Sequence, residues 1–80
     1  MDDQEIISQI GSLADEEKRL EELHVGEGIS SEDETRLKAI EVTLDRLWDL
    51  LRQRRALRDV GRSPEEAAIR PEGVVEGYRQ

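Results

Sequence analysis

The hydrophobic side chains of this sequence recur at steps of three and four residues in two separate stretches, one short and one long. That spacing places them on one side of an α-helix. The stripe of the first stretch consists of Ile6, Ile7, Ile10, Leu13, Leu20 and Leu23. The stripe of the second consists of Leu37, Ile40, Leu44, Leu47 and Leu51, with Trp48 beside it. The sequence therefore predicts two helices, over residues 3–24 and 31–60.

The residues between the two stretches can end one helix and begin another. Two glycines fall within the predicted turn, residues 25–30, and glycine readily adopts the left-handed conformation that closes a helix. Ser31-x-x-Glu34 has the spacing of a capping box, and Asp2 or Asp3 is suited to cap the first helix. A connection of about six residues is typical of antiparallel neighbours. We therefore predict an antiparallel, coiled-coil-like helical hairpin.

The remaining segment, residues 63–80, contains the two prolines of the chain. Ser63 and Pro64 suit the N-cap and the first position of a helix, and Pro71 prevents that helix from continuing. We predict a short third helix over residues 64–69 and an extended C-terminal tail after it. The fold class is then all-α, with a hairpin over residues 1–62 followed by this short helix and tail.

The hydrophobic side chains are too few for a thick core. Of 80 residues, 35% are hydrophobic and 40% are charged, and a core of this size contributes about 3–5 kcal/mol at best. Small proteins commonly add disulfides, a metal or a second subunit, and this sequence has no cysteine and one histidine. We therefore expect a homodimer in which two hairpins form a four-helix bundle, or association with an unidentified protein partner.

The hydrophobic stripes are also wider than one neighbouring helix covers. On the second predicted helix, Leu50 and Leu57 widen the stripe by about 60°, and Trp48 flanks it. On the first helix, small residues beside the stripe would let another helix approach closely. The candidate interface consists of Ile7, Gly11, Ala14, Trp48, Leu50 and Leu57. The alternative is that the C-terminal segment folds back and covers this face.

Charge is segregated along the chain. Residues 1–34 carry a net charge of −10 and residues 35–62 a net charge of +4, within a total of −8. Opposite charges attract, which favours a hairpin whose basic end faces Asp2, Asp3 and Glu5.

The basic end is a candidate patch for nucleic acid. It consists of Arg52, Arg54, Arg55, Arg58 and Arg62. Through it the chain could act as a regulator that contacts nucleic acid or a nucleic-acid enzyme. Nucleic-acid binding depends on neutralising phosphates, however, and the chain is acidic overall and lacks the interleaved aromatics of stacking sites. We favour the interpretation that these arginines neutralise the acidic N-terminus and the negative end of their own helix, and we do not expect nucleic acid as a partner.

No pattern of catalytic or cofactor-binding residues stands out in the sequence. His24, at the predicted end of the first helix, suits capping of terminal carbonyls. Glu21-x-x-His24 lacks the second copy that a carboxylate-bridged metal site requires. There is no glycine-rich phosphate loop, no nucleophile paired with a base and no zinc pattern. We expect no enzyme activity, no cofactor and no metal.

The sequence also predicts a location. The longest hydrophobic runs have two or three residues, far short of the roughly 20 that span a bilayer. The first residues lack the basic and apolar regions of a secretion signal, and cysteine is absent. We therefore expect a cytoplasmic protein that does not associate with a membrane.

Three segments carry a family resemblance: MDDQEI at residues 1–6, WDLLRQRRA at residues 48–56 and VEGY at residues 75–78. With them the chain resembles, over essentially its whole length, the short actinobacterial proteins grouped as a domain of unknown function, DUF2630. The resemblance implies a bacterial, cytoplasmic, free-standing small protein and carries over no catalytic or binding residues. Together with the residues, it indicates an uncharacterised, non-enzymatic helical protein that serves as a protein–protein interaction or structural module.

Overall fold

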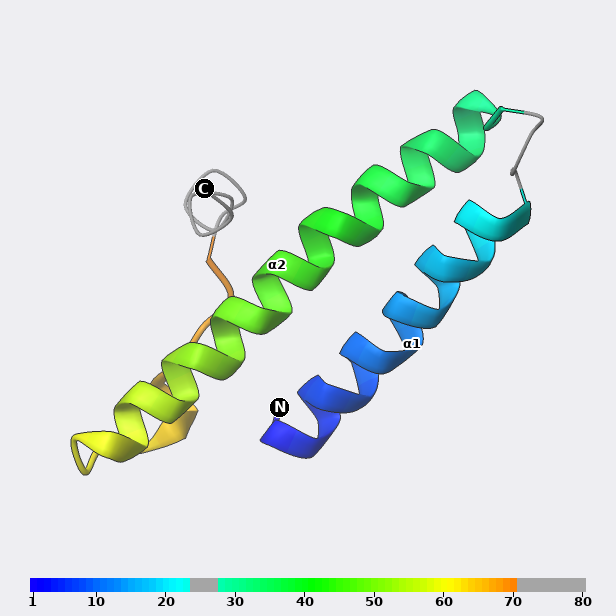
Figure 1. Ribbon diagram of the computed structural model, residues 1–80. Helices are drawn as coiled ribbons and strands as arrows, with labels where there is room; N and C mark the ends of the chain where they lie inside the picture. Colours follow the sequence, from blue (N-terminus) through cyan, green and yellow to red (C-terminus); the bar gives the residue numbers. More distant parts are fainter. Residues whose placement is uncertain (24–27, 71–80) are drawn as a thin grey trace.

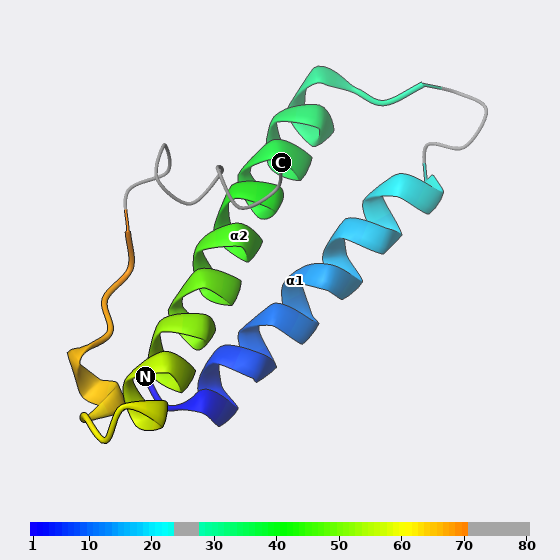
Figure 2. The ribbon, with the colours of Figure 1, turned by 60° about the vertical axis from the view of Figure 1, so that its left-hand side comes forward.

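The computed structural model describes residues 1–23 and 28–70 (Figure 1). Two helices, α1 (Asp3–Leu23) and α2 (Ser31–Asp59), lie side by side and run antiparallel, and a 3-10 turn, η1 (Pro64–Glu66), follows α2. The same arrangement is seen from a second direction in Figure 2. The predicted all-α hairpin is therefore confirmed. Neither long helix is apolar enough over its length to cross a membrane, as judged on the described residues.

Some sequence predictions lie outside the described residues. These are the capping role of His24, residues 25–27 of the predicted turn, and the C-terminal tail beyond Arg70.

Both helices begin with a side-chain cap. Asp2 Oδ1 accepts a hydrogen bond from the Glu5 amide at 2.8 Å, and Glu5 Oε1 accepts one from the Asp2 amide at 3.1 Å. This reciprocal pair is a capping box at the start of α1. For α2 the predicted cap is wrong by one residue: Ser30 is the N-cap, and its Oγ accepts from the Asp33 amide at 3.1 Å. Ser31 is instead the first helical residue.

Helix α2 ends at a glycine in the left-handed conformation. Gly61 has φ 77°, its amide donates to the Arg58 carbonyl at 3.1 Å, and the Arg62 amide donates to the Leu57 carbonyl at 2.8 Å. This pair of bonds is the Schellman arrangement, which satisfies carbonyls that a helix end leaves free. The chain therefore reverses after Gly61 and returns along α2.

The core lies between the two helices. It is one cluster of five buried hydrophobic side chains, with Leu13, Leu44 and Ala67 packed against it. The cluster consists of Ile6, Ile10, Leu47, Leu50 and Leu51. Nearer the start of α2, Ile40 is also fully buried. Each such side chain contributes about 1.5–3 kcal/mol by leaving water, so a core of this size holds the hairpin together with little to spare.

The third helix is much shorter than predicted. Only Pro64–Glu66 are helical, and Ala67 already has an extended backbone with ψ 145°. The cause is a side chain of α2: Gln53 Nε2 donates to the Ala68 carbonyl at 2.7 Å, and the Ala68 amide donates to Gln53 Oε1 at 3.3 Å. Both polar backbone groups of Ala68 are thus bound to Gln53, and a helix over residues 64–69 is excluded.

Residues 63–70, which we call the C-terminal segment, pack along one flank of α2, behind that helix in the view of Figure 1. Within this segment Ala67 touches the core cluster. The chain is elongated because α2 alone has 29 residues, and the overall extents are 51 × 24 × 18 Å.

Candidate functional site

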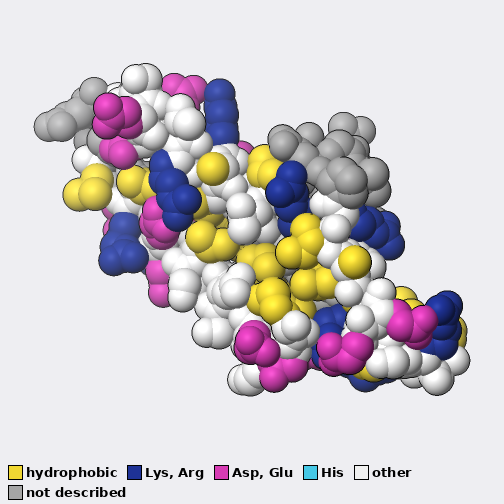
Figure 3. Space-filling view, turned by 180° about the vertical axis from the view of Figure 1, so that it is seen from behind, with side chains coloured by type: hydrophobic (Ala, Val, Ile, Leu, Met, Phe, Trp, Pro, Cys, Tyr) yellow, Lys and Arg dark blue, Asp and Glu magenta, His cyan; other side chains and the backbone are white. Residues whose placement is uncertain are grey.

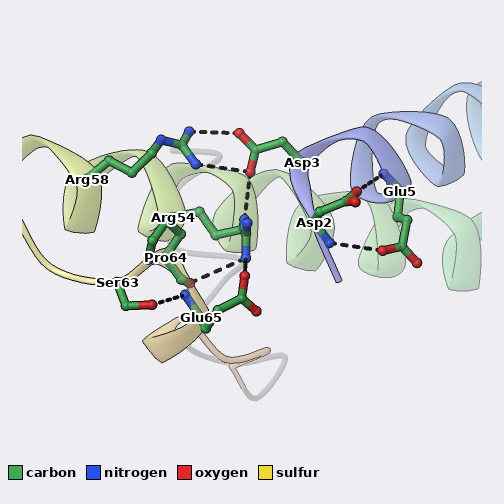
Figure 4. Close-up of polar contacts among 8 residues, drawn as sticks. All are labelled: Asp2, Asp3, Glu5, Arg54, Arg58, Ser63, Pro64 and Glu65. Atoms are coloured by element: carbon green, nitrogen blue, oxygen red, sulfur yellow. Dashed lines mark hydrogen bonds and ion pairs between the residues drawn. The ribbon is translucent and has the colours of Figure 1, made fainter.

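An ion-pair cluster closes the open end of the hairpin (Figure 4). Asp3 of α1 accepts from Arg54 Nε at 2.6 Å and from Arg58 Nη2 at 2.7 Å. Arg54 also reaches the C-terminal segment, where its Nη1 lies 3.4 Å from both the Pro64 carbonyl and Glu65 Oε1. One guanidinium therefore joins α1, α2 and η1.

The cluster perturbs the groups that form it. Hydrogen bonds from Arg58 and then Arg54 lower the pKa of Asp3 below its ordinary value. The bond to Asp3 raises the pKa of Arg54, whose side chain is only 8% exposed. Arg54 occupies the hydrophobic seam of α2, and its charge is matched there by carboxylates of the same chain. Its role is to hold the fold together.

The sequence predicted that the arginines near the end of α2 would face Asp2, Asp3 and Glu5. This prediction is confirmed at Asp3 but not at Asp2 or Glu5. Asp2 and Glu5 bind each other's amides as the cap of α1 and make no described contact with the arginines (Figure 4). At the other end of the hairpin, Arg36 makes two hydrogen bonds with Glu16, at 2.6 and 2.7 Å. The Arg36 guanidinium lowers the pKa of Glu16. The two helices are thus tied by ion pairs near both ends.

The predicted basic patch divides into two sets. Arg54 and Arg58 bind Asp3, and Arg62 pairs with Glu66 within the segment after α2. Arg52 and Arg55 lie exposed on the outer surface of α2. The structure therefore does not bring the five arginines together as one surface, because Arg54, Arg58 and Arg62 face carboxylates of the same chain.

The C-terminal segment is held to α2 by polar contacts that sequence reasoning missed. Besides binding Ala68, Gln53 Nε2 donates to Asp49 Oδ2 at 2.9 Å, and Arg70 Nε lies 3.5 Å from the same oxygen. Asp49 is 1% exposed, and its Oδ1 has no hydrogen-bond partner among the described residues. Asp49 and Gln53 stand four residues apart in a charged stretch and read as a solvated helix face, so only the packing of residues 63–70 shows their role.

The packing of the C-terminal segment affects how far two candidate interface residues, Leu50 and Leu57, are exposed. Leu50 is 6% exposed and belongs to the core cluster, beside Ala67. Its side chain is therefore covered within one chain, as the alternative of a folded-back C-terminal segment expected. Leu57 is half-buried and lines a shallow groove with Val60 and Arg62 at the end of α2.

The remaining candidates lie on the opposite side of the hairpin. Ile7 follows the buried Ile6, and Trp48 follows the buried Leu47, so each is rotated by about 100° in the same sense from the contact between the helices. Because the helices are antiparallel, these equal rotations carry both side chains to one side. Leu50 precedes a core residue, Leu51, and is rotated toward the other side.

We call this side the Trp48 face, and it presents large hydrophobic side chains to solvent. Trp48 is 51% exposed and Ile7 is 49% exposed. Gly11 and Ala14 are exposed as well, and no atom lies within 4 Å of where a Cβ of Gly11 would stand. The face consists of Ile7, Gly11 and Ala14 from α1 and Trp48, Arg52 and Arg55 from α2.

The two exposed arginines flank the tryptophan. Trp48, Leu51, Arg52 and Arg55 line a shallow depression of about 230 Å³. Tryptophan and arginine are the residue types most enriched where proteins bind one another tightly. The four residues occupy two successive turns of α2, so their relative positions are fixed by the helix.

The other side of the molecule exposes hydrophobic groups too. Figure 3, a view from behind Figure 1, shows hydrophobic side chains gathered across the middle of that surface with charged side chains around them. There Met1, Leu50 and Ile69 line a depression of about 220 Å³ together with the alanines of the C-terminal segment. Ile69 is 55% exposed. This second surface is a rival to the Trp48 face, and its exposed large hydrophobic side chains are Met1 and Ile69.

A metal site is not formed by the described residues. Within residues 1–23 and 28–70, no three His, Cys, Asp or Glu side chains lie close enough to hold an ion. Glu21 is exposed near the end of α1, and its predicted partner His24 lies outside the described residues.

Comparisons with known proteins place the chain in a family. Its residues 2–80 match the family described as "Protein of unknown function (DUF2630)". Uncharacterized proteins of Mycobacterium tuberculosis and Mycobacterium bovis are 51% identical to it over 77 residues, which covers 95% of this chain and 88% of theirs. No solved structure matches. The chain therefore belongs to the DUF2630 family of proteins of unknown function, as the sequence segments predicted.

Proposed function

We propose that this chain is a non-enzymatic protein–protein interaction or structural module of the cytoplasm, and that its binding surface is the Trp48 face. The observation that carries the proposal is the half-exposed Trp48, flanked by Arg52 and Arg55 on a rigid helix. Burying an indole of this size against a partner removes a large apolar area from water. The exposed half of Trp48 is not covered by any residue that the structure describes.

The titratable groups support a structural use of the charges. Five groups whose pKa departs clearly from its ordinary value are each members of an ion pair within the chain. They are Asp3, Glu16, Arg36, Arg54 and Arg62. Active sites perturb pKa values to suit proton transfer, whereas these shifts follow from pairing of opposite charges, which keeps both partners ionised.

The alternative of a nucleic-acid regulator has less support. It relied on five arginines acting together, and Arg54, Arg58 and Arg62 are bound to carboxylates of the same chain. The exposed pair that remains, Arg52 and Arg55, lies beside Trp48 and so belongs to the proposed protein-binding surface.

Photo-crosslinking in living bacteria tests the proposal. Trp48 is replaced by a photoreactive phenylalanine derivative of similar size, and Ile69, which is equally exposed on the rival surface, is replaced in a matched control. We expect discrete crosslinked products from position 48 and none from position 69. Products from position 69 alone, or from neither position, would contradict the proposal.

A further inference from the structure

We propose that the occupant of the Trp48 face is a second copy of this chain, packed so that α1 of each copy lies antiparallel across α2 of the other. This inference rests on the proposed function and names its partner. The two-fold axis then runs along the length of the hairpin, and the product is a four-helix bundle in which every helix runs antiparallel to its neighbours.

The first support is the amount of surface that one copy leaves exposed. Six hydrophobic side chains are buried in the described residues, while Ile7 and Trp48 of this face stay about half exposed. A thin hairpin covers its core from few directions, and a second hairpin packed on this face would bury both side chains.

The second support is the size of the face itself. Helix α1 has 21 residues, so it is about 32 Å long, and two packed helices are about 20 Å wide. A face of these dimensions offers roughly 600 Å² per copy. Two such faces together reach the lower end of the area that specific protein interfaces bury.

The third support is that the face is complementary to itself. Asp3 pairs with Arg54 and Glu16 pairs with Arg36, which fixes how α1 lies against α2. Counting along both helices from these pairs puts Ile7 and Trp48 within one helical turn of the same level. A two-fold axis along the hairpin preserves this level, so Ile7 of each copy meets Trp48 of the other, as a closed symmetric interface requires.

Charge selects this orientation over its main competitor. Helix α1 carries seven acidic and two basic side chains, net −5, while α2 carries seven of each. A two-fold axis across the hairpin would lay α1 on α1 and bring two strongly acidic helices together. The axis along the hairpin instead lays each α1 on the α2 of its partner, where Arg52 and Arg55 stand beside Trp48.

Sedimentation equilibrium with single variants tests whether the chain dimerises through the Trp48 face. We expect the native chain to be dimeric at micromolar concentrations. Trp48→Lys should raise the dimer dissociation constant at least about 30-fold, as loss of a buried tryptophan anchor does, and should keep the native helical circular dichroism because Trp48 lies outside the core. Ile69→Lys, the matched control, should leave the dimer intact.

Cysteine pairing tests the orientation, and the natural absence of cysteine makes it selective. Ile7→Cys and Trp48→Cys chains are prepared separately, then mixed and oxidised. We expect disulfide-linked heterodimers in the mixture to form much faster than the homodimers of either variant alone. Ile7→Cys chains that link to each other as quickly would show α1 lying on α1 and overturn the orientation.

The dimer inference can fail while the proposed function stands. A native chain that is monomeric at all concentrations, or a dimer broken by Ile69→Lys but not by Trp48→Lys, overturns this inference. If position 48 still crosslinks to a different protein in cells, the Trp48 face remains an interaction surface with another occupant. If it crosslinks to nothing, both proposals fail.

Discussion

Adjacent residues of the same type play opposite parts in this hairpin. Ile6 is fully buried in the core and Ile7 is 49% exposed on the Trp48 face. A rotation of about 100° separates them on α1. Their side chains are identical, so any difference in the effect of substitution comes from their surroundings.

Ile6→Ala and Ile7→Ala should therefore differ sharply in stability. We expect Ile6→Ala to lower the free energy of unfolding by about 2–4 kcal/mol, since it removes buried methylenes and leaves a cavity. Ile7→Ala should change it by about 0.5 kcal/mol or less at concentrations where the chain is monomeric. Urea unfolding followed by circular dichroism measures both, and equal losses would mean that the core is not where the structure places it.

Acid should weaken the hairpin through Asp3. Hydrogen bonds from Arg58 and Arg54 lower its pKa in the folded chain below the ordinary 3.8, so the folded state favours the ionised carboxylate. The stabilisation is present above the unfolded pKa and is lost as the pH falls through the lowered, folded value. Asp3→Asn should thus lower the urea midpoint at pH 7 and much less at pH 2.

Asp15→Asn is the matched control for this experiment, because Asp15 is an exposed carboxylate on the same helix. It should change the midpoint little at either pH. A loss at Asp3→Asn that is as large at pH 2 as at pH 7 would show that its ionisation contributes nothing to stability.

At the scale of elements, two neighbouring serines at the start of α2 have different roles. Ser30 Oγ accepts from the Asp33 amide, while Ser31 is inside the first turn. Ser30→Ala should cost about 1 kcal/mol of stability by removing the cap. Ser31→Ala should cost nothing or stabilise slightly, because alanine has the higher helix propensity. A larger loss at Ser31 in urea unfolding would restore the cap predicted from the sequence.

The helices could be predicted because each is specified by residues within it. Hydrophobic spacing, capping side chains and a closing glycine placed α1 at Asp3–Leu23 and α2 at Ser31–Asp59 within one residue of the predicted ends. The cap of α2 was off by one because Ser30 and Ser31 are chemically the same, and their difference is one of backbone angle.

The C-terminal segment could not be predicted in the same way. The conformation of its backbone is set by a contact between Ala68 and Gln53, which lies fifteen residues earlier in the chain. Local propensity had favoured a helix over residues 64–69. Likewise Leu50 was assigned to an interface because its angle on α2 widens the stripe, and only the packing of Ala67 shows that the chain covers it. Trp48 and Ile7 are about half exposed because no other described element reaches their side of the hairpin.

At the scale of the whole molecule, the distribution of charge decides which partners the surface can accept. The chain carries a net charge of −8, and its most basic stretch is partly neutralised by Asp3, Glu65 and Glu66. Binding to a polyanion depends on how many phosphates a protein neutralises. Two exposed arginines beside Trp48 offer few such contacts against a repulsive background.

We therefore expect no salt-dependent binding to double-stranded DNA or single-stranded RNA. Fluorescence anisotropy at about 50 mM and 200 mM salt measures it, since binding through several phosphates would weaken steeply over that range. If binding were seen, Arg52→Glu with Arg55→Glu should abolish it and Lys18→Glu with Lys38→Glu, which changes the net charge equally, should not. That combined result would mean that the Trp48 face binds nucleic acid and not protein. The indole would then stack on bases, and its two guanidinium neighbours would contact phosphates.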